Sequence, residues 1–298
     1  MTSTAAVQEQ PLNCYQGIPS FVEWRKAGVD VARWNQAMAS LNSHGELASD
    51  LLRRMRIIIR EAARSIAGRN NGRKSQLTLQ VQSAMWLAAL GEKGEDAQPA
   101  IESQLLACDY IIVAALKKRL ITEELIRELH VRTCRRQETY KIATAHGLRE
   151  EAFRSGEYKR FPNHVAPHLE RRPAYAPVAL TQSEMKKFCE ELNTDLFLAA
   201  HPVLQASYAL YSLLIIHPFA DGNGRVARAL ALLFTYRSNA IPMLALSQER
   251  EAYVASLVSA AMGEFQPLVD FVERRAINAI SSIESGIRTA RAGQPASS

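Results

Sequence analysis

The sequence predicts a mostly α-helical protein, on two observations. The first is composition: of 298 residues, 47% are hydrophobic but only 7% are aromatic, as in helical cores rich in alanine and leucine. The second is pattern, because apolar residues group into segments of helical length, and strand signal is confined to the segment from Tyr158 to His168. A chain of this length buries one substantial core, or a core and a smaller domain.

The predicted helices cover most of the chain. In order they are Val31–Leu41, Glu46–Ile66, Leu77–Leu90, Ile101–Lys118, Thr122–Cys134, Thr181–Asn193, Leu196–Ile216, Arg225–Ser238, Gln248–Ala261 and Phe265–Ile287. Breaks rich in glycine, proline and polar residues fall at 68–74, 91–99 and 171–177. The second break is the expected boundary, which gives an N-terminal helical region (1–100), a core (101–278) and a C-terminal helix end and tail (279–298).

The segment from Val203 to Ile216 reads VLQASYALYSLLII and predicts a buried helix. It is too long for a strand and shows no alternation. Pro218 cannot continue an ordinary helix, and it biases His217 away from helical dihedral angles. A helix resumes with Val226, so the glycines between the two segments lie at a helix–loop–helix junction.

This junction, 217–228, reads HPFADGNGRVAR and carries the chemistry of a phosphate site. Gly222-Asn223-Gly224 begins the second helix, where backbone N–H groups lack intrahelical partners and the helix dipole favours anions. Glycine also lets a ligand approach the backbone closely. Arg225 and Arg228 are three residues apart and share a helix face, from which both can bind phosphate oxygens.

Two further residues of the junction suit catalysis. Asp221 is a hard oxygen ligand for Mg²⁺, which completes its shell with phosphate oxygens and water. His217 is the group suited to proton transfer near neutral pH, whereas Phe219 is interpreted as a structural anchor. Each feature alone is more often a turn, a core histidine or a solvated arginine face. Together, within a dozen residues, they predict an enzyme that acts on a phosphate ester.

Residues 217–228 resemble the signature of the Fic family, HPFx(D/E)GNGRxxR, and match it at every specified position. The similarity extends over about 101–278. It includes the Leu-His end of an early core helix at His130, the segments Gly156–Arg160 and Pro173–Leu192, and Arg250–Tyr253. The resemblance implies a Fic-like helical core with a short β-hairpin flap, preceded by the N-terminal helical region.

The resemblance also implies transfer of AMP from ATP to a Ser, Thr or Tyr hydroxyl of a target protein, with release of pyrophosphate. His217 would be the catalytic base and Asp221 would hold Mg²⁺, with Mn²⁺ as a possible substitute. The remaining implied roles concern the nucleotide. Its phosphates would be bound by Gly222, Asn223, Gly224, Arg225 and Arg228. Tyr253 is a weaker candidate to line the pocket for the nucleotide base.

Three alternatives stay open. The same site could use UTP, GTP or a CDP-alcohol, it could transfer phosphate as a kinase does, or the chain could be an inactive docking protein. The implied partner is a protein substrate that pairs with the flap near Tyr158 to His168 by strand addition. Pro162 and Pro167 limit the hydrogen bonds that this segment can make. A homo-oligomer is also left open.

Many Fic proteins carry an inhibitory helix of pattern (S/T)xxxE(G/N), whose glutamate pairs with the second signature arginine. No segment of this chain matches that pattern. The N-terminal segment most similar to the pattern has Ala63 at the Ser/Thr position and Ala67 at the Glu position. A similar C-terminal segment matches the pattern only at its glutamate, Glu284. Either Arg228 is unopposed and the enzyme is constitutively active, or these similarities arise by chance.

The remaining features of the sequence bound its partners and location. The net charge of +6 comes largely from a basic stretch at 53–74, which we interpret as a solvated helix face, because no nucleic-acid-binding motif accompanies it. The four cysteines lack metal-ligand spacing. Without a signal peptide or an apolar run of membrane-spanning length, we expect a cytoplasmic protein with no membrane partner, and secretion as a bacterial effector stays open.

Overall fold

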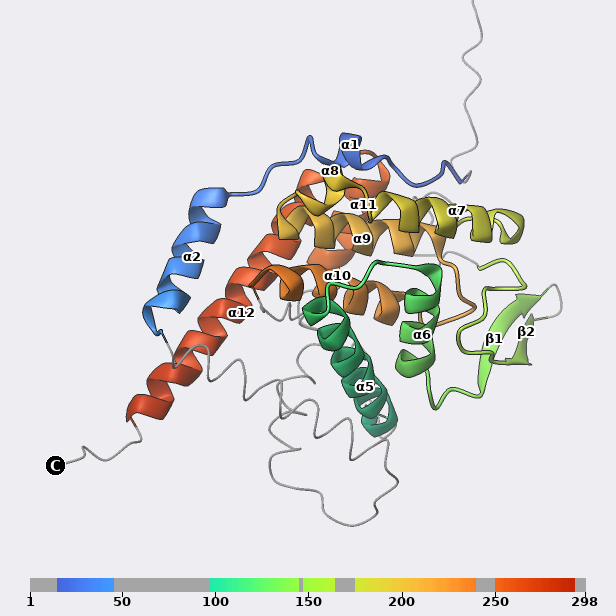
Figure 1. The fold of residues 1–298 in the computed structure, drawn as a ribbon. Helices are drawn as coiled ribbons and strands as arrows, with labels where there is room; N and C mark the ends of the chain where they lie inside the picture. Colours follow the sequence, from blue (N-terminus) through green and yellow to red (C-terminus); the bar gives the residue numbers. More distant parts are fainter. Residues whose placement is uncertain (1–14, 46–96, 145–146, 164–174, 240–249, 293–298) are drawn as a thin grey trace, which may run out of the picture.

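The computed structural model describes residues 15–45, 97–144, 147–163, 175–239 and 250–292. Its helices are α1 (Phe21–Trp24), α2 (Val31–Ser43), α5 (Ala97–Leu116), α6 (Glu123–Thr133), α7 (Val178–Glu191), α8 (Asp195–Leu198), α9 (Pro202–Ile216), α10 (Asn223–Asn239), α11 (Arg250–Ala261) and α12 (Gln266–Ala292). Two antiparallel strands, β1 (Thr139–Thr144) and β2 (Gly147–Ala152), complete the described part (Figure 1). The prediction of a mostly helical fold is confirmed.

Helix α9 lies at the centre of the core, as its apolar sequence predicts. Nearly every side chain from Val203 to Ile216 is buried. Helices α10, α12, α7 and α1 pack against it, and α5 packs against α10 from the other side (Figure 1). Both elements that flank the predicted phosphate site are therefore fixed by the core.

The predicted helix Leu196–Ile216 is divided in the structure, and its continuity was a wrong prediction. Helix α8 ends at Leu198 and α9 begins at Pro202. Proline at the first position of a helix lacks only an N–H that would be unpaired there, and it keeps the preceding His201 extended, with φ −59° and ψ 137°. The His201 Nδ1 then accepts a hydrogen bond from the Val203 N–H at 3.3 Å and caps the helix.

The first described segment, 15–45, shares the core with α9. The Trp24 indole N–H donates to the Ser207 hydroxyl at 3.1 Å, and the Tyr208 hydroxyl donates to the Pro19 carbonyl at 3.0 Å. Helix α2 packs along α12, and Figure 1 shows the two running side by side. The predicted helices Glu46–Ile66 and Leu77–Leu90 lie outside the described residues.

The strands lie at a different place from the predicted flap. They pair Thr139 with Ala152 through to Thr144 with Gly147, whereas 158–163 contains no strand and 164–168 lies outside the described residues. The prediction of a short β-hairpin is confirmed, but its predicted position was wrong in the part that the structure describes, 158–163. The backbone of this segment is bonded elsewhere, because the Lys159 N–H donates to the Pro218 carbonyl at 2.8 Å.

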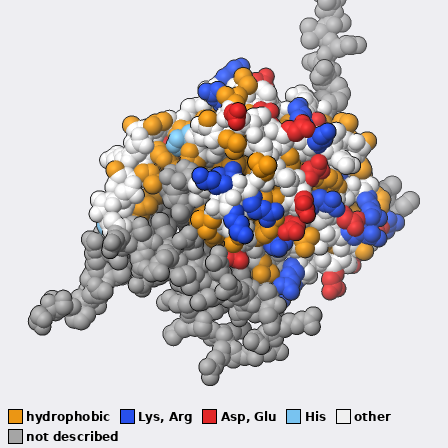
Figure 2. Space-filling view, in the orientation of Figure 1, with side chains coloured by type: hydrophobic (Ala, Val, Ile, Leu, Met, Phe, Trp, Pro, Cys, Tyr) orange, Lys and Arg blue, Asp and Glu red, His pale blue; other side chains and the backbone are white. Residues whose placement is uncertain are grey.

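The described surface shows no single-sign charge field on the face in Figure 2, where Lys and Arg are interspersed with Asp and Glu. The basic stretch at 53–74 is outside the described residues. Within the described ranges, no helix has the length and apolar character needed to cross a membrane.

Candidate functional site

The loop between α9 and α10 spans 217–222, and its first residue has a strained backbone. His217 adopts φ 50° and ψ 58°, in the left-handed region, which is uncommon for a residue other than glycine. Its N–H still donates to the Leu213 carbonyl at 2.9 Å, which closes the helix. The prediction that His217 departs from helical dihedral angles is confirmed. Strain of this kind persists where the surrounding structure imposes it.

The imidazole of His217 is held from two sides. Its Nδ1 lies 3.2 Å from the Leu214 carbonyl oxygen, and its ring stacks on Tyr175 with 3.9 Å between ring centroids and 20° between planes. In the tautomer that donates from Nδ1 to this carbonyl, Nε2 carries the basic lone pair. Tyr175 precedes α7 and was not foreseen as a site residue, since it shares no motif with the loop.

The start of α10 forms an anion cradle, defined here as the backbone N–H groups of Asn223, Gly224 and Arg225. These groups precede the first intrahelical bond, from the Val226 N–H to the Gly222 carbonyl at 3.0 Å. If Gly224 carried a Cβ, it would lie 3.3 Å from the Arg228 Nη1, so the Arg228 side chain reaches back over the cradle. The geometry is that expected for a phosphate site at a helix N-terminus.

The side chain of Asn223 braces the loop. It is 2% exposed. Its Oδ1 accepts from the Phe219 N–H at 2.9 Å, and its Nδ2 donates to the Phe219 carbonyl at 2.8 Å. Both ends of the amide are thus used on one residue of the loop, so the contribution of Asn223 to a phosphate would come from its backbone.

Gly222 has no room for a side chain. Its φ is +79°, and an added Cβ would lie 2.4 Å from the Cys134 Sγ and 3.3 Å from the His130 Nε2. Both neighbours are buried on α6 or at its end. The loop therefore lies directly on α6, and this close approach requires glycine.

The side chain of Gln137 bridges Asp221 and Arg225 by hydrogen bonds. The Gln137 Nε2 donates to the Asp221 Oδ2 at 2.7 Å, and the Arg225 Nη2 donates to the Gln137 Oε1 at 2.9 Å. The Asp221 carboxylate and the Arg225 guanidinium themselves are 4.0 Å apart, with 54% of the Asp221 side chain exposed. Gln137 belongs to no motif and was missed from the sequence.

Among the described residues of the loop, Asp221 is the carboxylate that could hold a metal ion together with a substrate. Within the described ranges, no three His, Cys, Asp or Glu side chains form a cluster that could hold one. Asp221 is an exposed carboxylate next to the anion cradle, and Mg²⁺ accepts one or two carboxylates plus phosphate oxygens and water. The residues present fit a nucleotide-bound Mg²⁺ held through Asp221.

His130 supports the loop from α6. Its ring stacks on Phe219 with 3.8 Å between centroids and 4° between planes, which agrees with the structural role expected for Phe219. The Gly156 N–H donates to its Nδ1 at 2.7 Å, so its Nε2 carries the proton and donates to the Asp221 carbonyl at 3.0 Å. Burial lowers the pKa of His130 from 6.5 to about 4.

This lowered pKa predicts a loss of stability in mild acid. Below pH 6.5 the unfolded chain protonates His130, while the folded protein does not until about pH 4, so folding stability falls as the pH drops through this window. Between pH 7 and 5 the expected loss is about 2 kcal/mol. Urea unfolding of the wild type and of His130→Phe, which retains a ring on Phe219, measures it. The prediction fails if both proteins lose the same free energy over this interval.

Two other residues named from the sequence lie on α11 and α12. Tyr253, on α11, packs its ring against Phe271 of α12 with 5.4 Å between centroids. Glu284 is buried on α12. Ala63 and Ala67 lie outside the described residues. In the part of the chain that the structure describes, no carboxylate lies within 4.0 Å of the Arg228 guanidinium.

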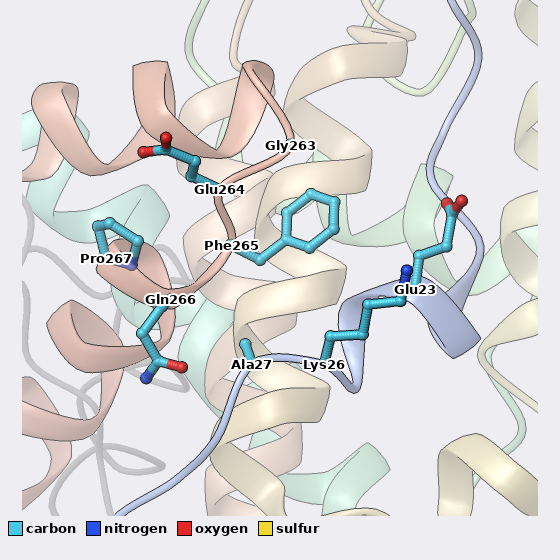
Figure 3. Close-up of a pocket in the computed structure, with 8 residues that line it drawn as sticks. All are labelled: Glu23, Lys26, Ala27, Gly263, Glu264, Phe265, Gln266 and Pro267. Atoms are coloured by element: carbon cyan, nitrogen blue, oxygen red, sulfur yellow. The ribbon is translucent and has the colours of Figure 1, made fainter.

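A recess of about 480 Å³ opens beside Asp221. We call it the hairpin recess, and it is lined by Gln137, Thr139, Tyr140, Lys141, Glu150, Ala220 and Asp221. A second recess of about 660 Å³ lies between the α1 region and the turn that joins α11 to α12 (Figure 3), and no residue of 217–228 lines it. Of these two recesses, the hairpin recess adjoins the predicted chemistry.

The chain is similar in sequence to known proteins. Residues 120–235 match the model of the Fic/DOC family. The protein adenylyltransferase Fic of Drosophila persimilis is 32% identical over 184 residues, which are 62% of this chain and 33% of that protein. The Drosophila willistoni protein of the same name is 30% identical over the same shares. The chain thus spans about a third of the length of these curated relatives.

Solved structures show the same fold. A Fic domain-containing signaling protein from Bacteroides thetaiotaomicron gives a TM-score of 0.61 at 19% identity, over 86% of this chain and 97% of that one. Fic-1 from C. elegans gives a TM-score of 0.52 at 20% identity, over 82% and 75%. At such identities the likeness concerns the arrangement of helices.

Proposed function

We propose that this chain is a Fic-type protein adenylyltransferase, which transfers AMP from ATP to a Ser, Thr or Tyr hydroxyl of a target protein and releases pyrophosphate. The observation that carries the proposal is the placement of an oriented His217 imidazole one loop away from the anion cradle, with Asp221 between them. The match of 120–235 to the Fic/DOC model and the names of the curated relatives support it.

In the proposed reaction, the Nε2 of His217 accepts the proton of the target hydroxyl. The hydroxyl oxygen attacks the α-phosphorus of ATP, a new P–O bond forms, and the bond to the β-phosphate oxygen breaks. The anion cradle donates hydrogen bonds to the phosphate oxygens as charge develops on them, and because it is fixed by the core it needs no rearrangement at that moment. Leu214 and Tyr175 keep the imidazole pointed at the acceptor.

The arginines would bind the leaving pyrophosphate. Arg225 lies beside Asp221 and suits the β-phosphate, and Arg228, one helical turn further, suits the γ-phosphate. Mg²⁺, or Mn²⁺ in its place, would neutralise phosphate charge when bound at Asp221. Tyr253 is the least supported of the proposed contacts, because its observed ring contact is with α12.

The proposed target-binding segment is attached to the loop at several points. Lys159 is 4% exposed, its Nζ donates to the Ile216 carbonyl at 3.3 Å, and burial lowers its pKa to about 8. The Asn163 Nδ2 lies 3.2 Å from the carbonyls of both Phe219 and Ala220. A target that docks on the described part of this segment, 158–163, would therefore lie close to His217.

We predict that the purified wild-type protein is active without any activating substitution, because no segment of the sequence matches the inhibitory pattern. Incubation with Mg²⁺ and ATP, followed by intact mass measurement of the protein and of proteins in a lysate, should show an AMP-sized addition. If a mass addition appears only with UTP, GTP or a CDP-alcohol, that compound is the donor instead of ATP. A phosphate-sized addition would indicate a kinase. No addition with any donor would contradict the proposal and favour a docking protein.

A further inference from the structure

Gln137 occupies an unusual position between two oppositely charged groups. It lies in the turn between α6 and β1, 84 residues before Asp221 and 88 before Arg225. Its amide donates to the first and accepts from the second, so one neutral side chain satisfies a carboxylate and a guanidinium at once. Its Nε2 also lies 3.3 Å from the Thr139 carbonyl, which anchors it to the first residue of β1.

The spacing that results leaves both charged groups ready for a ligand. At 4.0 Å the Arg225 Nη2 and the Asp221 Oδ2 are too far apart for a hydrogen bond. Arginine and carboxylate groups without such a spacer tend to form short, charge-assisted pairs. A direct pair here would occupy the carboxylate that the metal needs and the guanidinium that the phosphate needs.

The amide is also within reach of a ligand. Gln137 and Asp221 both line the hairpin recess, and Arg225 is held a second time, since its Nη1 lies 3.4 Å from the Thr133 carbonyl. The guanidinium is therefore oriented by α6 and by Gln137 together. The carboxylate is oriented by Gln137 and by the Gly222 N–H, which donates to its Oδ1 at 2.6 Å.

We propose that Gln137 is a positioning residue, which keeps Asp221 and Arg225 apart and oriented so that a metal-bound nucleoside triphosphate can bind between them. The inference rests on the proposed function and adds a residue to its site. Gln137 acts on binding and not on the proton transfer. Its loss is thus expected to raise the KM for Mg·ATP and leave kcat nearly unchanged, because the charged pair must separate before each binding event.

The test compares Gln137→Met with Gln182→Met, the same replacement at an exposed position on α7. Loss of a hydrogen bond that orients a metal ligand typically weakens metal binding about 10- to 100-fold. For Gln137→Met we therefore expect the KM for Mg·ATP and the half-activating Mg²⁺ concentration to rise about tenfold, with both unchanged in Gln182→Met. The shorter Gln137→Asn, which cannot span both partners, should behave like Gln137→Met.

A second readout separates this inference from the proposed function. Equilibrium binding of a fluorescent ATP analogue, with and without Mg²⁺, is measured for the same proteins. If the wild type transfers AMP and Gln137→Met binds Mg·ATP as tightly as the wild type, the positioning role is overturned and the function stands. If AMP transfer is absent, but Mg²⁺ tightens binding of the ATP analogue to the wild type and not to Gln137→Met, the positioning role stands and the proposed reaction does not. A wild type that binds no Mg·ATP overturns both.

Discussion

Replacement of His217 by alanine should lower the rate of AMP transfer by about 10²- to 10⁴-fold, the usual contribution of a positioned general base. The imidazole is held by Leu214 and Tyr175 rather than by the residues of the anion cradle. Removal of the ring therefore leaves the phosphate contacts in place. Nucleotide affinity should stay within a few-fold of the wild type, and kcat should carry the loss.

The control is His201→Ala, the same replacement at the opposite end of α9. His201 caps the first turn of that helix, so its loss costs about 1 kcal/mol of stability but should leave transfer intact. Single-turnover rates of AMP transfer and equilibrium binding of Mg·ATP are measured for both variants. A His217→Ala protein that retains wild-type transfer would show that another group accepts the proton.

The largest effect on stability is expected for Gly222→Ala. Any residue other than glycine pays about 1–2 kcal/mol for the left-handed backbone, and the methyl group would in addition overlap the Cys134 Sγ at 2.4 Å. Overpacking of this kind costs a further 1–3 kcal/mol, approximately. Since relief of the overlap must move the loop off α6, transfer should also be lost.

Gly263→Ala provides the matched comparison. Its φ is +87° and nothing lies within 4 Å of an added Cβ, so it isolates the backbone cost from the overlap. The free energies of unfolding of the two variants should differ by about 1–3 kcal/mol. Adding Cys134→Ala to Gly222→Ala removes the Sγ and should restore part of the difference. Equal destabilisation of the two glycine variants would refute the close packing of the loop on α6.

The helices could be predicted from the sequence where local and tertiary preferences agree. Helix α9 is apolar on all sides because it is buried on all sides, and α10 begins at the glycines that serve its N-terminus. The break before Pro202 was missed although the signal was present, since proline is common at the first position of a helix. The apolar residues on both sides of the break concealed it.

The strands could not be placed from the sequence. β2 reads GLREEA and is mostly exposed, so it lacks the alternation by which a half-buried strand is recognised. The segment from Tyr158 has a strand-like composition, but its Lys159 is bonded to the end of α9 instead. Pairing partners, which decide such cases, are tertiary information.

For the site, the sequence identified the residues that lie close together in the chain and missed those that the fold brings to them. Asp221, Arg225 and the anion cradle follow one another at a helix start, and the structure places them side by side. Gln137 and Tyr175 reach the same place from distant segments with no recognisable pattern. The catalytic and nucleotide-binding roles stay predictions.

The left-handed backbone of His217 has a consequence for how this sequence can change. Glycine or asparagine would occupy such a position at lower conformational energy than histidine. Selection for stability alone would therefore favour glycine or asparagine in place of His217. With histidine there, the chain gives up folding stability at the residue on which its proposed reaction depends. Stability and activity oppose each other at this position, and a copy released from its catalytic task would be expected to lose the histidine early.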